Sequence, residues 1–331
     1  MPSLRTEVTE VATGLGMLGF DSVERSLVHR PDQLSDVDGG TWARIVGAWE
    51  DPRHRADLAG AFRNGQVFLA AEDGLRGRRP LLVEWKGGHR TVGVDPVPVD
   101  LRVDHVFLVS CKYASRILLN AAPAQLFDRD GGGRSDWFAE VAPEQYQELY
   151  GLVRRSLAGG GDLPPRAADL ARHHRSRLRL AVTEAHWHGA VQEAYRLLCT
   201  EVSRATADRW RHSVATPRAQ EATLWRLLRI GPAPYFMLGT STQRTLRLRV
   251  TTPWDWRRRF EFRRLDVWAE EGGQARVGWR ATVRDHEAAA DRAVDGHVEI
   301  RWSHGRFAQA PEAKVYLDTA HEDVPGYVPL R

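Results

Sequence analysis

The sequence predicts an α/β (α+β) fold with a small mixed sheet flanked by helices, a helical middle segment and an antiparallel, β-rich C-terminal part. Three observations predict it. In the first third of the chain, short apolar runs rich in β-branched residues follow helical patterns. Residues 142–230 have a mainly helical pattern. From Gly231 onward, several runs alternate apolar and basic residues, as a half-exposed sheet does.

These patterns divide the 331 residues into four parts. The parts are a lead-in at 1–40, an α/β core at 41–135, a helical segment at 136–230 and a β-rich region at 231–331. In the last part, alternating runs predict strands at 246–252, 259–269, 275–285, 296–303 and 313–319. We expect these strands to form an antiparallel sheet.

The predicted core begins with two helices. Residues 41–49 have apolar side chains at helical spacing, and Asp51-Pro52 supplies a capping residue and a first-turn proline for the second helix. We expect that helix to end at Asn64-Gly65, a typical C-terminal signal. Strands should follow at 66–71, 80–85 and 101–112, and a helix should begin within 115–120.

The composition indicates a globular protein without a membrane partner. The net charge is +4, no apolar run approaches the roughly 20 residues of a membrane span, and the N-terminus lacks a signal-peptide pattern. Two cysteines cannot build a disulfide framework, and no Cys/His pattern has zinc spacing. We therefore expect a cytoplasmic protein.

Lysine is scarce, because only three of the 47 basic residues are lysine. Each is the third residue of a short pattern: Glu84-Trp85-Lys86, Ser110-Cys111-Lys112 and Glu312-Ala313-Lys314. Residues two apart on a strand point to the same face, so a carboxylate and an ammonium can face one metal site. The carboxylate would bind Mg²⁺ (or Mn²⁺), and the lysine would stabilise charge on a phosphate. For Lys314 we expect only a structural salt bridge.

The segment at about 40–130 resembles the PD-(D/E)xK, restriction-endonuclease-like superfamily. A helix is followed by strands that carry Glu-Trp-Lys at 84–86 and then VDHVFLVSCKYASRILLN at 103–120, in which Ser110-x-Lys112 stands in place of an acid and a lysine. The resemblance implies a restriction-endonuclease-like core and metal-dependent hydrolysis of phosphodiester bonds in DNA. It also implies a role in bacterial restriction or anti-phage defence.

One candidate catalytic set combines Glu84, Lys86 and Asp104. It requires the strands at 80–86 and 101–112 to be antiparallel neighbours, so that the end of the first lies beside the start of the second. Glu84 and Asp104 would be the metal ligands, and Lys86 would be the catalytic cation. The competing interpretation is a solvated ion-pair network on the exposed face of a sheet.

A second set lies at the opposite end of the strand pair, where Ser110 and Lys112 would meet Asp73. It keeps the usual order of the family, an acid before the lysine motif, but has serine in place of the second acid. Asp73 would be the metal ligand and Lys112 the catalytic cation. Asp104 cannot belong to this set, because eight residues of straight strand place it about 26 Å from Lys112. Cys111 would point the other way, into the core.

Arginines alternate with aromatic residues at 254–264 and at 301–307. Guanidinium groups suit contacts with phosphates, and aromatic rings suit stacking on bases. The residues expected to bind nucleic acid are Arg257, Arg258, Arg259, Trp254, Trp256, Arg301 and Arg306. The competing interpretation is a sheet with aromatic residues inward and arginines outward.

Together these features predict a metal-dependent DNA endonuclease that acts alone, as a homodimer or with a partner protein. The alternative is a non-catalytic nucleic-acid-binding or scaffold subunit that acts with a partner enzyme. One feature supports the alternative: Glu84-x-Lys86 precedes Asp104, which reverses the conventional order. Neither a P-loop nor a glycine-rich dinucleotide motif supports a third class, an enzyme of small phosphorylated molecules.

Overall fold

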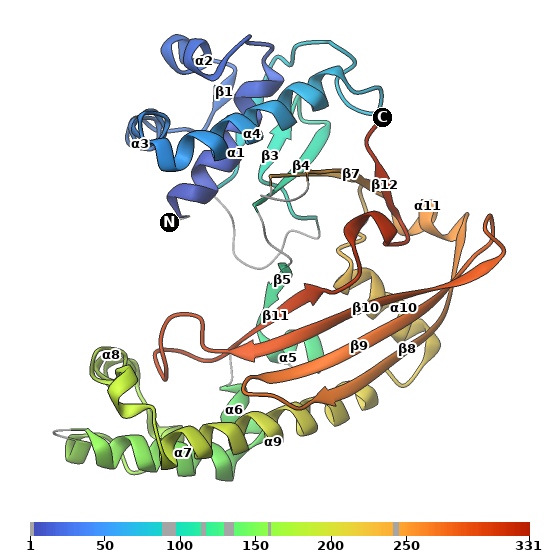
Figure 1. Ribbon diagram of the computed structural model, residues 1–331. Helices are drawn as coiled ribbons and strands as arrows, with labels where there is room; N and C mark the ends of the chain where they lie inside the picture. Colours follow the sequence, from blue (N-terminus) through green and yellow to red (C-terminus); the bar gives the residue numbers. More distant parts are fainter. Residues whose placement is uncertain (1–2, 88–96, 114–116, 129–135, 158–159, 241–244) are drawn as a thin grey trace. The chain divides into compact units, whose positions relative to one another are not determined.

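The computed structural model describes residues 3–87, 97–113, 117–128, 136–157, 160–240 and 245–331. The chain forms two compact units (Figure 1). Unit 1 comprises Met1–Ser115, Leu228–Phe260 and Ala320–Arg331, and unit 2 comprises Arg116–Leu227 and Glu261–Thr319. The division differs from four consecutive parts, because strands far apart in the chain complete each sheet.

Unit 1 contains a mixed sheet whose described strands have the order β1-β2-β3-β4-β6-β7-β12. β2, β3 and β4 are antiparallel neighbours, whereas β6 is parallel to β4 and β1 is parallel to β2. The strands are β1 (Leu34–Ser35), β2 (Val83–Trp85), β3 (Leu101–Val103), β4 (Phe107–Tyr113), β6 (Tyr235–Thr240), β7 (Leu246–Val250) and β12 (Tyr327–Pro329). The helices are α1 (Leu4–Met17), α2 (Val23–His29), α3 (Gly39–Glu50), α4 (Pro52–Ala70) and α11 (Pro253–Arg257), with a 3-10 turn at His321–Asp323.

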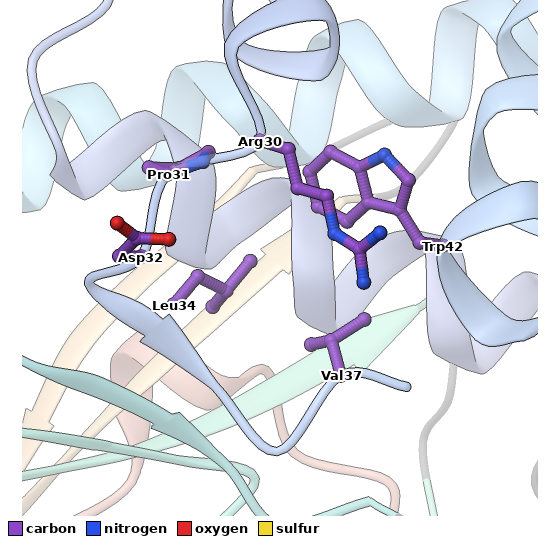
Figure 2. Close-up of a pocket in the computed structure, with 6 residues that line it drawn as sticks. All are labelled: Arg30, Pro31, Asp32, Leu34, Val37 and Trp42. Carbon is purple, nitrogen blue, oxygen red and sulfur yellow. The ribbon is translucent and has the colours of Figure 1, made fainter. Parts of the chain in front are cut away.

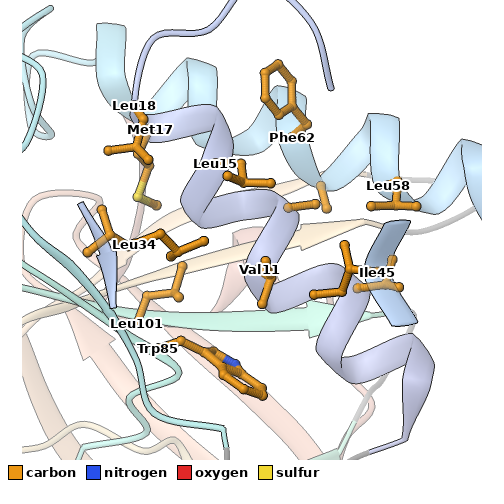
Figure 3. Packing of buried hydrophobic residues seen from close by; sticks show 14 of the residues in the cluster. Val11, Leu15, Met17, Leu18, Leu34, Ile45, Leu58, Phe62, Trp85 and Leu101 are labelled. Carbon is orange, nitrogen blue, oxygen red and sulfur yellow. The ribbon is translucent and has the colours of Figure 1, made fainter. Parts of the chain in front are cut away.

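The core of unit 1 lies between the sheet and the helices α1, α3 and α4. Figure 3 shows α1 side chains between those of the other two helices and those of the sheet. The residues labelled there are Val11, Leu15, Met17, Leu18, Leu34, Ile45, Leu58, Phe62, Trp85 and Leu101. The segment expected to be a lead-in at 1–40 therefore contributes a central helix, because Val8, Val11, Leu15 and Met17 of α1 are fully buried.

Two glycines allow α1 and α4 to pack in close contact. A Cβ added to Gly16 would lie 2.0 Å from the carbonyl oxygen of Phe62, and a Cβ added to Gly65 would lie 2.0 Å from that of Thr13. Any larger residue at either position would push the helices apart, so these glycines are required by packing rather than by a turn.

The prediction that the second core helix ends at Asn64-Gly65 is wrong. α4 continues to Ala70, so residues 66–70 are helical and not a strand. Gly65 serves the helix contact described above, and Asn64 is buried, with its Nδ2 donating to the carbonyl oxygen of Gly239 at 2.6 Å. A dipeptide typical of helix ends is used here for close packing and for a bond to the sheet.

The prediction of one strand at 101–112 is also wrong, because the chain reverses within it. β3 ends at Val103, and Asp104 and His105 have φ angles of 47° and 58°. Two consecutive residues with positive φ form the turn that matches the twist of a hairpin. β4 then runs antiparallel to β3, and the predicted antiparallel pairing of the strand at 80–85 with this region is confirmed by β2 and β3.

Unit 2 contains a sheet in the order β5-β11-β10-β9-β8 and a set of helices. The strands are β5 (Ile117–Ala121), β8 (Phe260–Glu270), β9 (Ala275–Asp285), β10 (Ala290–Arg301) and β11 (Glu312–Leu317). The helices are α5 (Pro123–Phe127), α6 (Trp137–Val141), α7 (Pro143–Ser156), α8 (Arg172–Ala181), α9 (Ala190–Ser213) and α10 (Pro217–Leu227), with 3-10 turns at Gly160–Asp162, Ala167–Asp169 and Glu184–His186.

The local patterns in unit 2 are those expected from the sequence, with one exception. Helices occupy most of 136–230, and β8 to β11 fall on the predicted strands. The exception is 115–120, where a strand, β5, pairs with β11 in place of the expected helix. None of the helices described in either unit combines the length and apolar content needed to cross a membrane.

Candidate functional site

Glu84 lies at the centre of an ion-pair cluster. Its carboxylate accepts hydrogen bonds from Arg102 Nε at 2.5 Å and Nη2 at 2.6 Å, and from Lys86 Nζ at 3.1 Å. His105 Nδ1 lies 3.1 Å from the same carboxylate. The hydrogen bonds from Arg102 lower the pKa of the Glu84 carboxyl to about 2. The register of β2 and β3 places Glu84 opposite Arg102. Glu84 therefore belongs to an ion-pair network, which was the competing interpretation.

Asp104 has partners different from those of Glu84. Its Oδ1 accepts hydrogen bonds from the main-chain N–H groups of Leu81 at 2.7 Å and Leu82 at 3.0 Å. Arg78 forms an ion pair with Oδ2 at 3.1 Å, outside hydrogen-bond geometry. Asp104 therefore fixes the segment that leads into β2. In the described part of the chain, no hydrogen bond or ion pair joins Asp104 and Glu84 to a common group.

Asp73 is bound to the last residue of the chain. Its Oδ2 accepts a hydrogen bond from Arg331 N at 3.3 Å, and its own N–H donates to the Arg331 carbonyl at 3.2 Å. Its described contacts include neither Ser110 nor Lys112. Neither catalytic set expected from the sequence is therefore brought together by these contacts.

Asp100 is the acid that the structure places beside the Ser110 motif. It is 4% exposed, and its Oδ2 accepts hydrogen bonds from Ser110 Oγ at 3.2 Å and from Cys111 N at 2.5 Å. Its main chain joins both neighbouring strands, since Lys86 N donates to its carbonyl and its own N–H donates to Val109 O, each at 2.8 Å. The hairpin turn at the end of β3 makes this contact possible.

Two of the three lysines lie on the same sheet face as Asp100. Lys86 continues the β2–β3 ladder by one residue and is the cross-strand neighbour of Asp100. Lys112 lies two residues beyond Ser110 on β4 and shares its face. Cys111 packs against the core on the opposite face, as expected. We call Lys86, Asp100, Ser110 and Lys112 the Asp100 site.

The Asp100 site fits a magnesium ion in a minimal form. Among the described residues, no three His, Cys, Asp or Glu side chains gather as a metal site, and the Asp100 site has one carboxylate. Mg²⁺ keeps several water ligands and is often held by one or two carboxylates together with phosphate oxygens of a substrate. Asp100 can supply that single carboxylate. Glu84 shares its face but is already engaged by Arg102 and Lys86.

Asp100 has a signal in the sequence that the predictions did not use. It directly precedes a strand and lies ten residues ahead of Ser110-x-Lys112, which is the order of acid and lysine motif that the resemblance requires. The prediction of one straight strand at 101–112 gives Asp100 no place beside Ser110. The turn at Asp104 is what gives Asp100 its place beside Ser110.

Of the residues expected to bind nucleic acid, five lie in unit 1. Trp254 is 76% exposed and remains a candidate. Trp256 is 1% exposed and donates from Nε1 to the Pro325 carbonyl at 3.1 Å, so the prediction that it contacts nucleic acid is wrong: its ring is in the core. The arginines at 257–259 include two exposed side chains and one, Arg259, whose guanidinium lies 5.1 Å from the Phe260 ring.

The other two, Arg301 and Arg306, lie in unit 2 and already have acidic neighbours. Arg301 lies 3.6 Å from Glu299. The guanidinium of Arg306 lies 3.9 Å from the Trp187 ring and forms an ion pair with Glu184 at 3.1 Å. These seven residues are therefore divided between two units and do not form one surface within either.

Unit 1 also has a pocket of about 210 Å³ that contains none of the candidate site residues. It is lined by Arg30, Pro31, Asp32, Leu34, Val37 and Trp42 (Figure 2). The Arg30 guanidinium lies over the Trp42 ring at 5.6 Å, so one side of the pocket is filled by a cation–π contact. Its lining contains one carboxylate, that of Asp32, and no lysine.

A scan against protein-family models, a search of curated proteins and a search of solved structures found no match to this chain.

Proposed function

We propose that the chain is a Mg²⁺-dependent DNA endonuclease of the PD-(D/E)xK type, with the Asp100 site as its catalytic centre. The observation that carries the proposal is the contact of a buried carboxylate, Asp100, with Ser110 on the face that also bears Lys86 and Lys112. The mixed sheet with helices against one face agrees with the core that the resemblance implies. A role in restriction or anti-phage defence belongs to the same proposal and rests on the resemblance.

Each residue of the site has a distinct role in this proposal. Asp100 provides the carboxylate for the metal, and the Ser110 hydroxyl and the Cys111 N–H hold that carboxylate in one orientation. The ammonium of Lys112 stabilises negative charge that develops on the phosphate. Mg²⁺, when bound, supplies a Lewis acid and a more acidic water. Lys86 adds positive charge nearby, although it is also bound to Glu84.

The test is cleavage of supercoiled and linear DNA by the purified chain in Mg²⁺, in Mn²⁺ and in EDTA. The informative variant is Lys112→Ala. Its matched control is Lys314→Ala, because Lys314 in unit 2 forms its expected ion pair with Glu312 at 3.8 Å. We expect the parent and the control to cut with metal and the Lys112 variant to be inactive. Equal cutting by all three proteins would remove Lys112 from the mechanism.

A second candidate function is a nucleic-acid-binding subunit that does not cleave. One observation favours it: the site contains a single carboxylate among the described residues, and the carboxylate of Glu84 is engaged by cations. In that case the parent protein would bind DNA in a salt-dependent manner and cut none of the substrates with either metal.

A further inference from the structure

Among the arginines of unit 1 that form no ion pair with a carboxylate in the described part of the chain, three come from α4 and β7, which a hydrogen bond between Arg247 and Asn64 joins. They are Arg63 on α4 and Arg247 and Arg249 on β7, and we call them the arginine cluster. Several other exposed arginines of unit 1 do have acidic partners; Arg25, for example, binds Asp21 at 2.5 Å. Guanidinium groups without acidic partners and close to one another repel, so the cluster is a candidate site for an external anion.

Arg247 is held in place by the helix beside it. Its Nε donates to Asn64 Oδ1 at 3.0 Å, and Asn64 Nδ2 donates in turn to the Gly239 carbonyl at 2.6 Å. Asn64 is 1% exposed, so both bonds are shielded from water. Burial, and then the charge of Arg63, lowers the pKa of Arg247. The protein therefore fixes this guanidinium in a position where its charge is unfavourable without an anion.

Arg249 provides an independent observation. Its Nε is buried and has no hydrogen-bond partner among the described residues. The register of β6 and β7 places it opposite Phe236, whose ring contacts Phe68 at 4.8 Å. A buried N–H group next to aromatic rings costs free energy unless a ligand accepts its hydrogen bond. This donor points to an acceptor that the described residues do not supply.

The arginine cluster and the Asp100 site lie at one end of the same sheet. Gly239, to which Asn64 is bound, pairs with Lys112 in the parallel β4–β6 ladder. β7 is the next strand, and the backbone of Leu246, the counterpart of Lys112 on β7, lies about 10 Å from that of Lys112. Arg247 and Arg249 have their side chains on the opposite face of the sheet.

We infer that the arginine cluster binds backbone phosphates of duplex DNA, apart from the phosphate at the Asp100 site. The inference rests on the proposed function, since it names a second contact with the same substrate. The guanidinium group suits this ligand because its planar fork of donors matches phosphate oxygens. The cluster is separate from the arginines at 257–259, which the sequence pattern indicated.

The test is DNA binding in EDTA, where no cleavage occurs. The anisotropy of a fluorescein-labelled 20-base-pair duplex reports the Kd of the parent and of the triple variant Arg63→Gln, Arg247→Gln, Arg249→Gln over a range of salt concentrations. Three lost phosphate contacts should lower the slope of log K against log salt by about 2.7 and weaken binding roughly 10- to 100-fold. The matched control replaces Arg5, Arg25 and Arg53 by Gln; all three are exposed and paired with Asp.

Unchanged slope and affinity in the cluster variant, or an equal loss in the control, would overturn the inference whether or not the parent cuts DNA. A cluster-specific loss in a protein that cuts nothing would retain the inference and reject the nuclease. The single variant Arg249→Met separates binding from folding. We expect it to lower the slope by about 0.9 and to keep or raise the Tm, because it removes an unpartnered buried donor. A fall in Tm of several degrees would show that Arg249 stabilises the fold and would contradict its role as a donor to DNA.

Discussion

Two adjacent rows on one face of the unit 1 sheet hold their carboxylates in opposite ways. In the first row, Glu84 on β2 lies opposite Arg102 on β3 and is bound by that guanidinium and by Lys86. In the second row, Asp100 is bound by a hydroxyl and a main-chain N–H group, from Ser110 and Cys111. The described donors to the first carboxylate are cationic side chains, whereas those to the second include a hydroxyl and a main-chain N–H group.

The different partners of Glu84 and Asp100 show that a Glu-x-Lys motif is not by itself a metal site. The residue directly across the strand pair decides the outcome, because a bidentate arginine competes with any cation for the same two oxygens. Glu84 meets such an arginine and becomes part of the stability of the sheet. Asp100 meets Ser110, which fixes the carboxylate without removing its charge.

The largest effect expected from this comparison is on cleavage by Asp100→Asn. The amide keeps an oxygen that can accept from Ser110 and Cys111 but cannot bind a metal as a carboxylate does, so the rate of plasmid nicking should fall about 100- to 1000-fold. Glu84→Gln is the control, and its rate should remain within about threefold of the parent. Equal losses in the two variants would mean that both rows belong to one site.

For stability we expect the opposite ranking, with a larger loss of unfolding free energy in Glu84→Gln than in Asp100→Asn. Glu84→Gln leaves Arg102 and Lys86 without their carboxylate, and the free energy of unfolding should fall by about 2 kcal/mol at neutral pH. Asp100→Asn preserves its neutral hydrogen bonds and should cost less. Urea unfolding followed by circular dichroism measures both. A variant at Glu84 as stable as the parent would show that the ion-pair cluster contributes nothing.

The contribution of Glu84 to stability should depend on pH in a defined window. The carboxyl has a pKa of about 2 in the folded chain, below the ordinary value of 4.5, so the unfolded chain takes up the proton first as the pH falls. The stabilisation is therefore complete above about pH 5 and is lost as the pH falls from 4.5 toward 2. The difference in unfolding free energy between the parent and Glu84→Gln should shrink across this range. A constant difference would contradict the assignment.

The smallest effect should come from Lys86→Met, because Lys86 lies beside Asp100 in the second row but its ammonium is bound to Glu84 of the first. Its side chain is 30% exposed and bonds Glu84, so its loss should lower stability by less than about 1 kcal/mol. Cleavage should fall less than about tenfold, whereas Lys112→Met should be inactive. If Lys86→Met were inactive and Lys112→Met active, the catalytic row would be that of Glu84.

Much of the fold could be predicted where one pattern controls a whole element. The alternation of apolar and basic residues in 259–269 and 275–285 predicts two strands, and the structure has β8 and β9 there. The pattern failed where tertiary packing used a residue differently. Gly65 resembles a helix end but is required by the contact with α1, and Asp104-His105 reverses the chain without the glycine or asparagine that usually marks a hairpin.

The candidate site could be predicted only in part for the same reason. Scarcity of lysine identified Lys86 and Lys112 without any structural information. Choosing their acidic partner required the register of the strands, because Asp100 and Asp104 have the same strand parity and lie only about 13 Å apart along an extended chain. The sequence did not signal the turn at Asp104-His105. Because of this turn, Asp100 lies beside Ser110, whereas Asp104 binds the main chain ahead of β2.

The interrupted chain path of unit 1 has a consequence for biosynthesis. β6 hydrogen-bonds to β4 but follows it in the chain only after Arg116–Leu227, the first segment of unit 2, has been made. Until then the nascent polypeptide presents the open edge of β4, where a foreign strand can pair. Truncated products that stop before Leu228 should therefore aggregate, and productive folding must wait for late-synthesised residues to return to an early scaffold.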